Sequence, residues 1–204
     1  MKKTGLIILA AGNASRMGKP KQLLAIGQQS LLEHALQEGQ LAVGERLIVV
    51  LGAYQQSIQE GINHTGWRVA INEDWESGMA SSIRAGMQQL LRDFPDTEQV
   101  ILAVADQPHI TAGLFQRLGQ LRLNSAKGIV ACQYADTQGV PVLFDRIYFD
   151  KLQALSGKQG AKKLIQQYST DVAVQDFPEG AIDLDTPQDY AQFCAGIINT
   201  KMHG

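Results

Sequence analysis

The sequence contains little cysteine. Its 204 residues include only Cys132 and Cys194, which lie far apart and form no CxxC pair. This usage excludes a disulfide framework and a thiolate metal site, and it is typical of a reducing compartment. We therefore expect a cytoplasmic protein.

Neither sign of charge is in excess, and no long apolar run is present. Eighteen basic and 20 acidic residues give a formal net charge of -2, and the basic residues are scattered. The charge gives no reason to expect nucleic acid or an anionic membrane as a partner. The apolar run over residues 5–11 is far shorter than a membrane span and leads into a loop without a cleavage region. It predicts a buried first strand rather than a signal peptide.

Short apolar runs alternate with longer amphipathic stretches, which predicts strands alternating with helices. The predicted strands are residues 5–11, 46–51, 68–71, 100–105, 128–132, 140–144 and 172–174. The predicted helices are residues 31–41, 55–61, 79–91, 112–123, 146–155 and 161–168, with a last helix that begins at Pro187. Ser30 and Glu33 have the spacing of a capping box at the start of the first helix.

The strand run Leu47-Ile48-Val49-Val50 is apolar throughout, as expected when helices cover both faces of a parallel sheet. We therefore expect one three-layer, Rossmann-like α/β domain over residues 1–204, with a mostly parallel sheet and helices on both faces. In such sheets ligands bind at the carboxyl ends of the strands, so functional residues should follow strands directly.

A loop with the sequence LAAGNASRMGKPK follows the first predicted strand. Small residues at Ala10, Ala11 and Gly12 would let a ligand approach the backbone amides. Arg16 and Lys21 would add a planar and a flexible cation for phosphate oxygens. The alternative is a plain strand-to-helix turn with two solvated cations.

Two common phosphate motifs are excluded. A Walker A loop has four residues between its glycines, whereas five separate Gly12 from Gly18, and Pro20 follows Lys19. The Rossmann GxGxxG fingerprint is also absent.

The loop resembles the LAAGxSxRMGxxK signature of the MobA-like nucleotidyltransferases, and the members it is most similar to are the molybdenum cofactor cytidylyltransferases. The resemblance implies a fold of the nucleotide-diphospho-sugar transferase type and a loop that binds a nucleoside triphosphate. It implies these nucleotide-binding residues in the loop: Ala10, Ala11, Gly12, Ser15, Arg16, Gly18 and Lys21. It also implies catalytic roles for Arg16, Lys21 and Asp106.

Asp106 ends an apolar run and is followed by Pro108. A carboxylate at a strand end could hold Mg²⁺, which takes only one or two protein carboxylates. On local sequence alone, a turn with Pro108 explains Asp106 equally well. The family carries a D-x-P motif here whose aspartate binds the metal, so the resemblance implies Asp106 as a magnesium ligand.

A second acidic segment precedes the last helix. Thr186, Pro187 and Asp189 are typical of a helix start, which explains Asp189 without any chemistry. Capping does not explain Asp183 and Asp185, which lie on the same face of an extended segment. The family has a similar D-x-DTPxD element in which one aspartate completes the metal site. The resemblance implies Asp185 as the second magnesium ligand, with Asp183 as a supporting or acceptor-site group.

Two further segments are similar to family elements. The family places nucleoside contacts in an N-x-x-W-x-x-G-M-x-x-S segment, which implies Asn72, Gly78 and Ser82, although simple capping by Ser77 also explains the local pattern. A G-x-P element belongs to the acceptor half, but close cytidylyltransferases often carry histidine where this chain has Val140.

The loop over residues 157–162 would add cations for an acceptor phosphate, or it is simply a helix connection. The four histidines have no metal-ligand spacing.

The implied reaction is attack by an acceptor phosphate oxygen on the α-phosphorus of a nucleotide, with release of pyrophosphate. The Ala10-Ala11 pair resembles CTP users, whereas Gly-Gly resembles the guanylyltransferases. The resemblance implies CTP and a molybdopterin acceptor, with a molybdoenzyme or its chaperone as a further partner.

Two alternatives stay open. One is a nucleotidyltransferase with another substrate pair: GTP with molybdopterin, or a sugar or polyol phosphate acceptor. The other is a non-catalytic accessory protein that binds nucleotide or cofactor. The joint presence of Arg16, Lys21, Asp106 and Asp185 favours an enzyme, because binding alone does not require the metal carboxylates.

Overall fold

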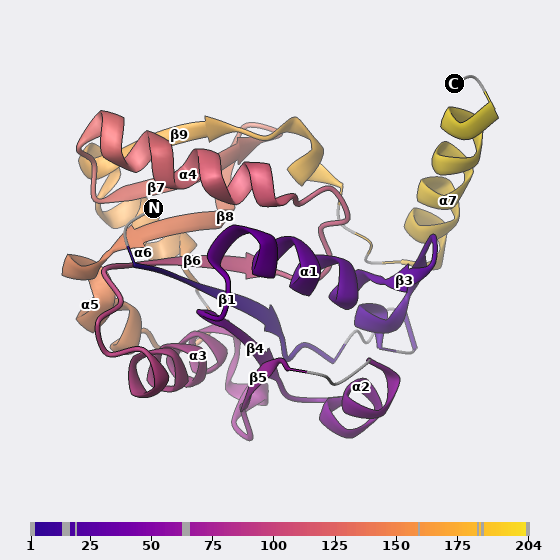
Figure 1. Ribbon diagram of the computed structural model, residues 1–204, viewed down its shortest axis with the longest axis horizontal. Helices are drawn as coiled ribbons and strands as arrows, with labels where there is room; N and C mark the ends of the chain where they lie inside the picture. Colours follow the sequence, from indigo (N-terminus) through magenta and orange to yellow (C-terminus); the bar gives the residue numbers. More distant parts are fainter. Residues whose placement is uncertain are drawn as a thin grey trace.

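A seven-stranded sheet forms the centre of the protein (Figure 1). The structure, a computed structural model, describes residues 3–13, 17–18, 20–62, 66–158, 160–182, 184 and 186–202, with the backbone alone over 196–202. The strands are β1 (Thr4–Ala10), β4 (Leu47–Leu51), β5 (Arg68–Ile71), β6 (Gln99–Val104), β7 (Ile129–Tyr134), β8 (Thr137–Asp145) and β9 (Val172–Asp176). All seven confirm predicted strands.

The strand order is β5-β4-β1-β6-β8-β7-β9. Strands β5, β4, β1 and β6 pair in parallel, β8 pairs antiparallel with both of its neighbours, and β9 pairs in parallel with β7. Of the strands in this sheet, only β8 runs against the others, which confirms the mostly parallel sheet. The carboxyl ends of β1, β4, β5 and β6 therefore lie along one edge.

The helices are α1 (Leu31–Val43), α2 (Gln55–Gly61), α3 (Met79–Asp93), α4 (Ala112–Ser125), α5 (Phe149–Gln153), α6 (Lys162–Gln167) and α7 (Pro187–Met202). Short 3-10 turns are η1 (Lys21–Leu23), η2 (Trp75–Ser77), η3 (Arg146–Tyr148), η4 (Ser169–Asp171) and η5 (Pro178–Ala181). The helix predicted over 146–155 is divided into η3 and α5. The two-residue strands β2 (Ala25–Ile26) and β3 (Gln29–Ser30) form a separate hairpin that was not predicted, because two residues carry no periodicity.

The core consists of two apolar layers, one on each face of the sheet. Along β1, Leu6 and Ile8 pack with α1, α2 and α4, whereas Ile7 and Leu9 pack with α3, α5 and α6. Figure 1 shows α1 and α4 lying across one face of the sheet. Because helices cover both faces of the sheet, the successive residues Leu6 to Leu9 are all apolar, although they point alternately to opposite faces. The three-layer prediction is confirmed.

The helix starts predicted at Ser30 and at Thr186 are confirmed. Ser30 and Glu33 form a reciprocal capping box at α1. At α7, Thr186 N donates to an Asp189 carboxylate oxygen at 2.8 Å, and Asp189 N donates to Thr186 Oγ1 at 3.2 Å. Asp189 is therefore a capping residue.

The two cysteines are free, which confirms that they form no disulfide. Cys132 is fully buried in β7, and burial raises the pKa of its thiol to about 12. Cys194 lies half-buried on α7.

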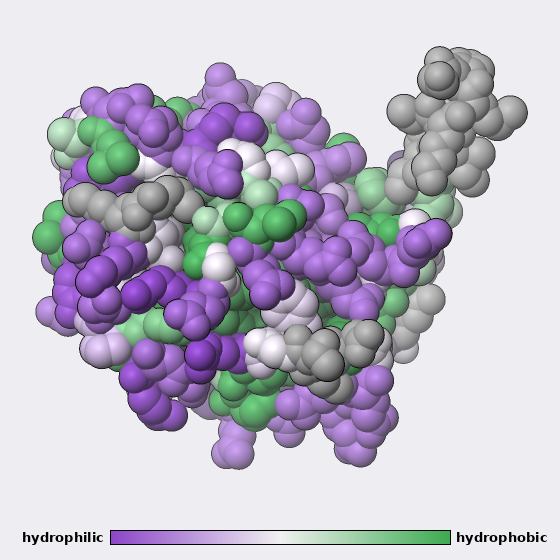
Figure 2. Space-filling view, viewed as in Figure 1, coloured by the Kyte–Doolittle hydropathy of each residue, from purple (hydrophilic) through white to green (hydrophobic). Residues whose placement is uncertain are grey.

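The face seen in Figure 1 is mostly hydrophilic, with hydrophobic residues in small groups (Figure 2). In the described part of the chain, no helix combines the length and apolarity that a membrane span requires.

We expect Gly86→Ala to lower the free energy of unfolding by about 1–2 kcal/mol, because overpacking outweighs the gain in helix propensity. A Cβ at Gly86 in α3 would lie 2.6 Å from Ile7 Cγ2 and 2.9 Å from Val50 Cγ2. Gly113→Ala in α4 is the matched control, since its nearest neighbour would lie 3.5 Å away. Urea unfolding measures both variants. Equal stability for the two would contradict the tight packing of α3 on the sheet.

Candidate active site

A cavity of about 480 Å³ opens at the carboxyl ends of β1 and β6. It is lined by Leu9, Ala10, Ala11, Gly12, Asn13, Lys21, Gln22, Trp75, Glu76, Gly78, Met79, Ser82, Val104, Ala105, Asp106 and Lys158. A larger hollow of about 670 Å³ lies at the amino ends of β1 and β6, beside Thr4 and Gln99. Because ligands of parallel sheets bind at the carboxyl ends, the smaller cavity is the candidate site.

Seven predicted site residues lie together on this cavity: Ala10, Ala11, Gly12, Lys21, Gly78, Ser82 and Asp106. Gly18 is exposed with a φ of 66° and is not part of the cavity lining. Ser15, Arg16, Asp183 and Asp185 lie outside the described residues. The proposed roles of these four residues stay predictions.

Lys21 and Asp106 form an ion pair across the cavity, although 85 positions separate them in sequence. Lys21 Nζ contacts Asp106 Oδ2, and the two side chains are only 17% and 19% exposed. Lys21 begins η1, and Asp106 follows the end of β6. The parallel sheet thus brings together the two described residues that were predicted to be catalytic.

Asp106 offers a buried oxygen that suits a divalent cation. Its Oδ1 is buried and accepts no hydrogen bond within the described part of the chain. An unpartnered carboxylate oxygen is costly unless a hydrogen bond or a cation satisfies it. No group of three or more potential metal-ligating side chains occurs among the described residues, but Mg²⁺ needs only one or two carboxylates. The donor set therefore fits a magnesium-type ion.

A backbone hydrogen bond connects Asp106 with the second acidic segment. Leu184 is fully buried, and its N–H donates to the Asp106 carbonyl oxygen at 3.4 Å. Leu184 is the residue between Asp183 and Asp185. This contact joins the segment named by the family resemblance to the described metal candidate.

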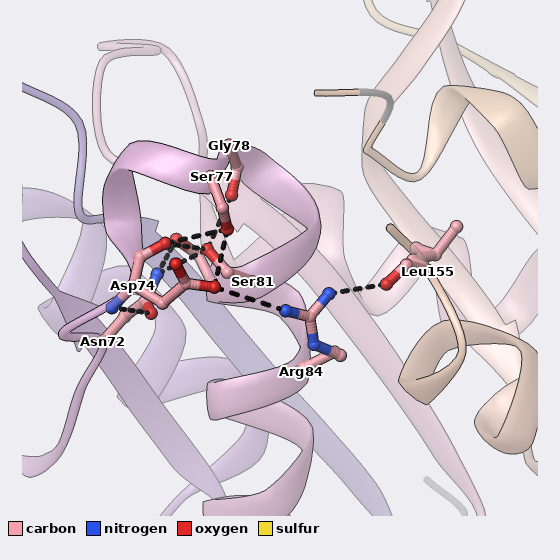
Figure 3. A network of polar contacts seen from close by, with 8 residues as sticks. Asn72, Asp74, Ser77, Gly78, Ser81, Arg84 and Leu155 are labelled. Carbon is pink, nitrogen blue, oxygen red and sulfur yellow. Dashed lines mark hydrogen bonds and ion pairs between the residues drawn. The ribbon is translucent and has the colours of Figure 1, made fainter. Parts of the chain in front are cut away.

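Asn72 is buried and belongs to the network of polar contacts at the start of α3 (Figure 3). Its Nδ2 donates to Ser81 Oγ at 2.8 Å and to Ser82 Oγ at 2.9 Å, and its Oδ1 accepts from Asp74 N at 3.1 Å. Of these residues Ser82 lines the cavity, so the contacts of Asn72 position Ser82. The family resemblance implies Asn72 as a nucleoside contact, and that role stays a prediction.

The expectation that Ser77 caps α3 is wrong. Gly78 occupies the N-cap position, and Ser77 Oγ lies 2.7 Å from Asp74 Oδ2 instead. Gly78 has a φ of 108°, which a residue with a side chain rarely adopts. Because glycine has no side chain, α3 begins without a side-chain cap.

The same network reaches the loop that carries Lys158. In Figure 3, Arg84 points from α3 toward Asp74 and toward the Leu155 carbonyl oxygen, at 3.6 Å and 2.6 Å. A Cβ at Gly78 would lie only 2.9 Å from Lys158 Cα. Residues 155–158 are therefore packed tightly onto the start of α3, with Lys158 at the cavity.

A second hollow, of about 460 Å³, adjoins the candidate cavity and shares the lining residues Met79 and Lys158 with it. The predicted acceptor element contributes Gly139 and Val140, the loop before α6 contributes Gly160, and the first turn of α6 contributes Lys162 and Lys163.

Gln107, directly after Asp106, contacts the backbone of Val140, which lines this second hollow. It is buried, and its Nε2 lies 3.0 Å from the Gly180 carbonyl oxygen and 3.4 Å from that of Val140. Sequence reasoning missed Gln107 and the equally buried Gln22, because burial of a glutamine leaves no local signal.

A comparison with protein-family models matches residues 6–172 to the MobA-like NTP transferase domain. The chain belongs to this family. It is accordingly a nucleotidyltransferase of the MobA-like type, with the fold of the nucleotide-diphospho-sugar transferases.

Three curated relatives show how far the similarity extends. The nicotine blue oxidoreductase of Paenarthrobacter nicotinovorans is 32% identical, but the match covers only 55% of this chain and 53% of that protein. The molybdenum cofactor cytidylyltransferase of Escherichia coli K12 is 26% identical over 90% of this chain and 92% of its own length. The molybdenum cofactor guanylyltransferase of Vibrio parahaemolyticus is 28% identical over 94% and 95%.

Among solved structures, Rv0371c from Mycobacterium tuberculosis H37Rv in complex with manganese is 28% identical. The alignment has a TM-score of 0.76 and covers 94% of this chain and 97% of that one. Members of this family use divalent metals.

We expect Gly78→Ala to destabilise the protein by about 2–3 kcal/mol, because it combines an unfavourable backbone conformation with a clash. Its Cβ would meet backbone atoms of Gly157 and Lys158 at 3.0 Å and 2.9 Å. Gly157→Ala is the matched control, since its φ is also positive, at 70°, but its Cβ would meet nothing within 4 Å. This control should lose only about 1 kcal/mol. Urea unfolding distinguishes the two, and equal losses would contradict the packing of the loop on α3.

Proposed function

We propose that the protein transfers CMP from CTP to molybdopterin in a magnesium-dependent reaction that releases pyrophosphate. The observation that carries this proposal is the Lys21–Asp106 pair at a cavity formed by the family's loop at the end of β1. A phosphate-binding cation and a metal-binding carboxylate at one point are what phosphoryl-type transfer requires.

The choice of CTP rests on two supports. Ala10 and Ala11 line the cavity, in the segment where the resemblance separates CTP users from guanylyltransferases. The relative from Escherichia coli is a cytidylyltransferase and matches over 90% of this chain. The relative from Vibrio parahaemolyticus is a guanylyltransferase, and GTP is therefore the competing nucleotide.

The residues of the chain would divide the work as follows. Backbone amides of the loop after β1 hold the phosphates, and Lys21 donates from Nζ to a phosphate oxygen. Asp106, together with Asp185, would hold Mg²⁺, which neutralises charge on the phosphate oxygens when it is bound. Arg16 would add a bidentate contact to the phosphates.

The bond from the α-phosphorus to the leaving pyrophosphate breaks as an acceptor phosphate oxygen bonds to that phosphorus. No protein nucleophile takes part. The second hollow, with Lys158 and Lys162, would receive the acceptor. Because the core layers on both faces share one sheet, we treat residues 1–204 as one nucleotidyltransferase domain. A molybdoenzyme or its chaperone as recipient of the product, and a cytoplasmic location, stay predictions from the sequence.

We expect Asp106→Asn to reduce the rate of pyrophosphate release by about 100- to 1,000-fold, because the amide is uncharged and binds a divalent cation poorly. Asp136→Asn is the matched control, since Asp136 lies in the β7–β8 turn with a φ of 58°, which asparagine tolerates. The assay contains CTP, Mg²⁺ and molybdenum cofactor. An Asp106→Asn variant as active as the Asp136→Asn variant would contradict the proposed role of Asp106.

The nucleotide and the acceptor are tested together. Pyrophosphate release is measured with each of the four nucleoside triphosphates and Mg²⁺, with and without molybdenum cofactor, and we expect release only with CTP and cofactor. Preference for GTP, or release only with a sugar or polyol phosphate, would be consistent with nucleotidyl transfer but would contradict the proposed substrates, CTP and molybdopterin. Tight nucleotide binding without release under any condition would overturn the enzyme and favour an accessory protein.

A further inference from the structure

Gln22 is a buried side chain that lies against the loop after β1. It follows Lys21 in η1 and is only 3% exposed. Its Nε2 donates to the Ala10 carbonyl oxygen at 2.8 Å and to the Gly12 carbonyl oxygen at 3.2 Å. The two N–H groups of one side-chain amide thus bind the last residue of β1 and the loop that follows it.

The two carbonyl groups fix the orientation of the Gln22 amide. Its Oε1 is buried and has no hydrogen-bond partner within the described residues. A rotated amide would place Oε1 against two carbonyl oxygens, which also only accept hydrogen bonds. The Gln22 amide therefore satisfies the carbonyl oxygens of Ala10 and Gly12, and its own Oε1 stays without a hydrogen bond from the described residues.

These contacts determine where the loop amides point. In a trans peptide the C=O and the following N–H lie on opposite sides of the C–N bond. Gln22 holds the Ala10 and Gly12 carbonyls toward itself, so the N–H groups of Ala11 and Asn13 are directed to the other side. Ala11 and Asn13 both line the cavity, together with Gly12, which is exposed.

We propose that Gln22 is a positioning residue of the phosphate site, which directs the N–H groups of Ala11 and Asn13 toward phosphate oxygens. The inference rests on the proposed function insofar as the cavity takes a nucleoside triphosphate. Lys21 and Gln22 are neighbours in η1, so one short turn supplies the cation to Asp106 and orients the amides of the loop.

The test measures binding of two probes to the full chain by calorimetry in the presence of Mg²⁺: inorganic tripolyphosphate, which has no base, and CTP. Gln22→Met has a similar shape but no donors, and we expect it to weaken the binding of both probes by about ten-fold at every pH.

Gln22→Glu should bind both probes poorly at pH 8, where a carboxylate faces two carbonyl oxygens. Part of the affinity should return, relative to wild type, at pH 5.5, because a protonated carboxyl group can donate one hydrogen bond. This rescue keeps the proposal testable if Gln22→Met does not fold.

Gln99→Met is the matched control. Gln99 is 1% exposed, its Nε2 donates to Thr4 Oγ1 at 2.7 Å, and its Oε1 likewise has no partner among the described residues. It begins β6, at the opposite edge of the sheet from the cavity. Urea unfolding of all variants should show similar losses of stability for Gln22→Met and Gln99→Met, with affinity changed only in the former.

Unchanged affinity for tripolyphosphate in Gln22→Met, or no recovery of Gln22→Glu at low pH, would overturn the positioning role while the proposed function stands. Failure of the wild-type chain to bind tripolyphosphate and all four nucleoside triphosphates would overturn both.

Discussion

The ion pair between Lys21 and Asp106 joins the two strand ends on which the site depends. The parallel pairing of β1 with β6 brings the loop after one strand beside the residue after the other. Each side chain is more than four-fifths buried, so the pair is poorly screened by solvent. Removing one partner of such a pair leaves a charge with reduced solvation, which is costly to stability as well as to chemistry. In the arrangement described, Lys21 occupies one carboxylate oxygen and leaves the other without a hydrogen bond.

Close backbone packing is the second constraint on the site. A Cβ at Gly52, directly after β4, would lie 2.8 Å from the Ala11 carbonyl oxygen and from Trp75 Cβ. A Cβ at Gly160 would lie 2.3 Å from Met79 Sδ. The loop after β1, the η2 turn and the loop before α6 can approach one another only because these positions carry no side chain. Six of the sixteen residues that line the cavity are glycine, alanine or serine, and at these positions the backbone is open to a ligand bound through its phosphates.

Much of the architecture could be predicted from the sequence, because buried parallel strands have unbroken runs of apolar residues. The run over residues 47–51 and the capping box at Ser30 and Glu33 are strong local signals, and the structure confirms both. The hairpin of β2 and β3 was missed because each of its strands has only two residues, too few to show a periodicity in the sequence.

The site was predictable where residues follow strands and not where they support others. Lys21 and Asp106 were identified by the loop motif and the strand-end position, and the structure brings them together. Gln22, Gln107 and the supporting role of Asn72 could not be predicted, since their partners are backbone carbonyls or hydroxyls that only the folded chain brings near. Buried amides of this kind are indistinguishable in sequence from solvated ones.

The most direct test of the account is a crystal structure of the protein with CTP and Mg²⁺. We expect Mg²⁺ bound to an Asp106 carboxylate oxygen at about 2.1 Å, with Lys21 Nζ within about 3 Å of a phosphate oxygen. We also expect the phosphates to lie against the loop after β1. An intact Lys21–Asp106 contact without a metal, with the nucleotide bound elsewhere on the protein, would contradict the central claim that this pair marks the catalytic centre.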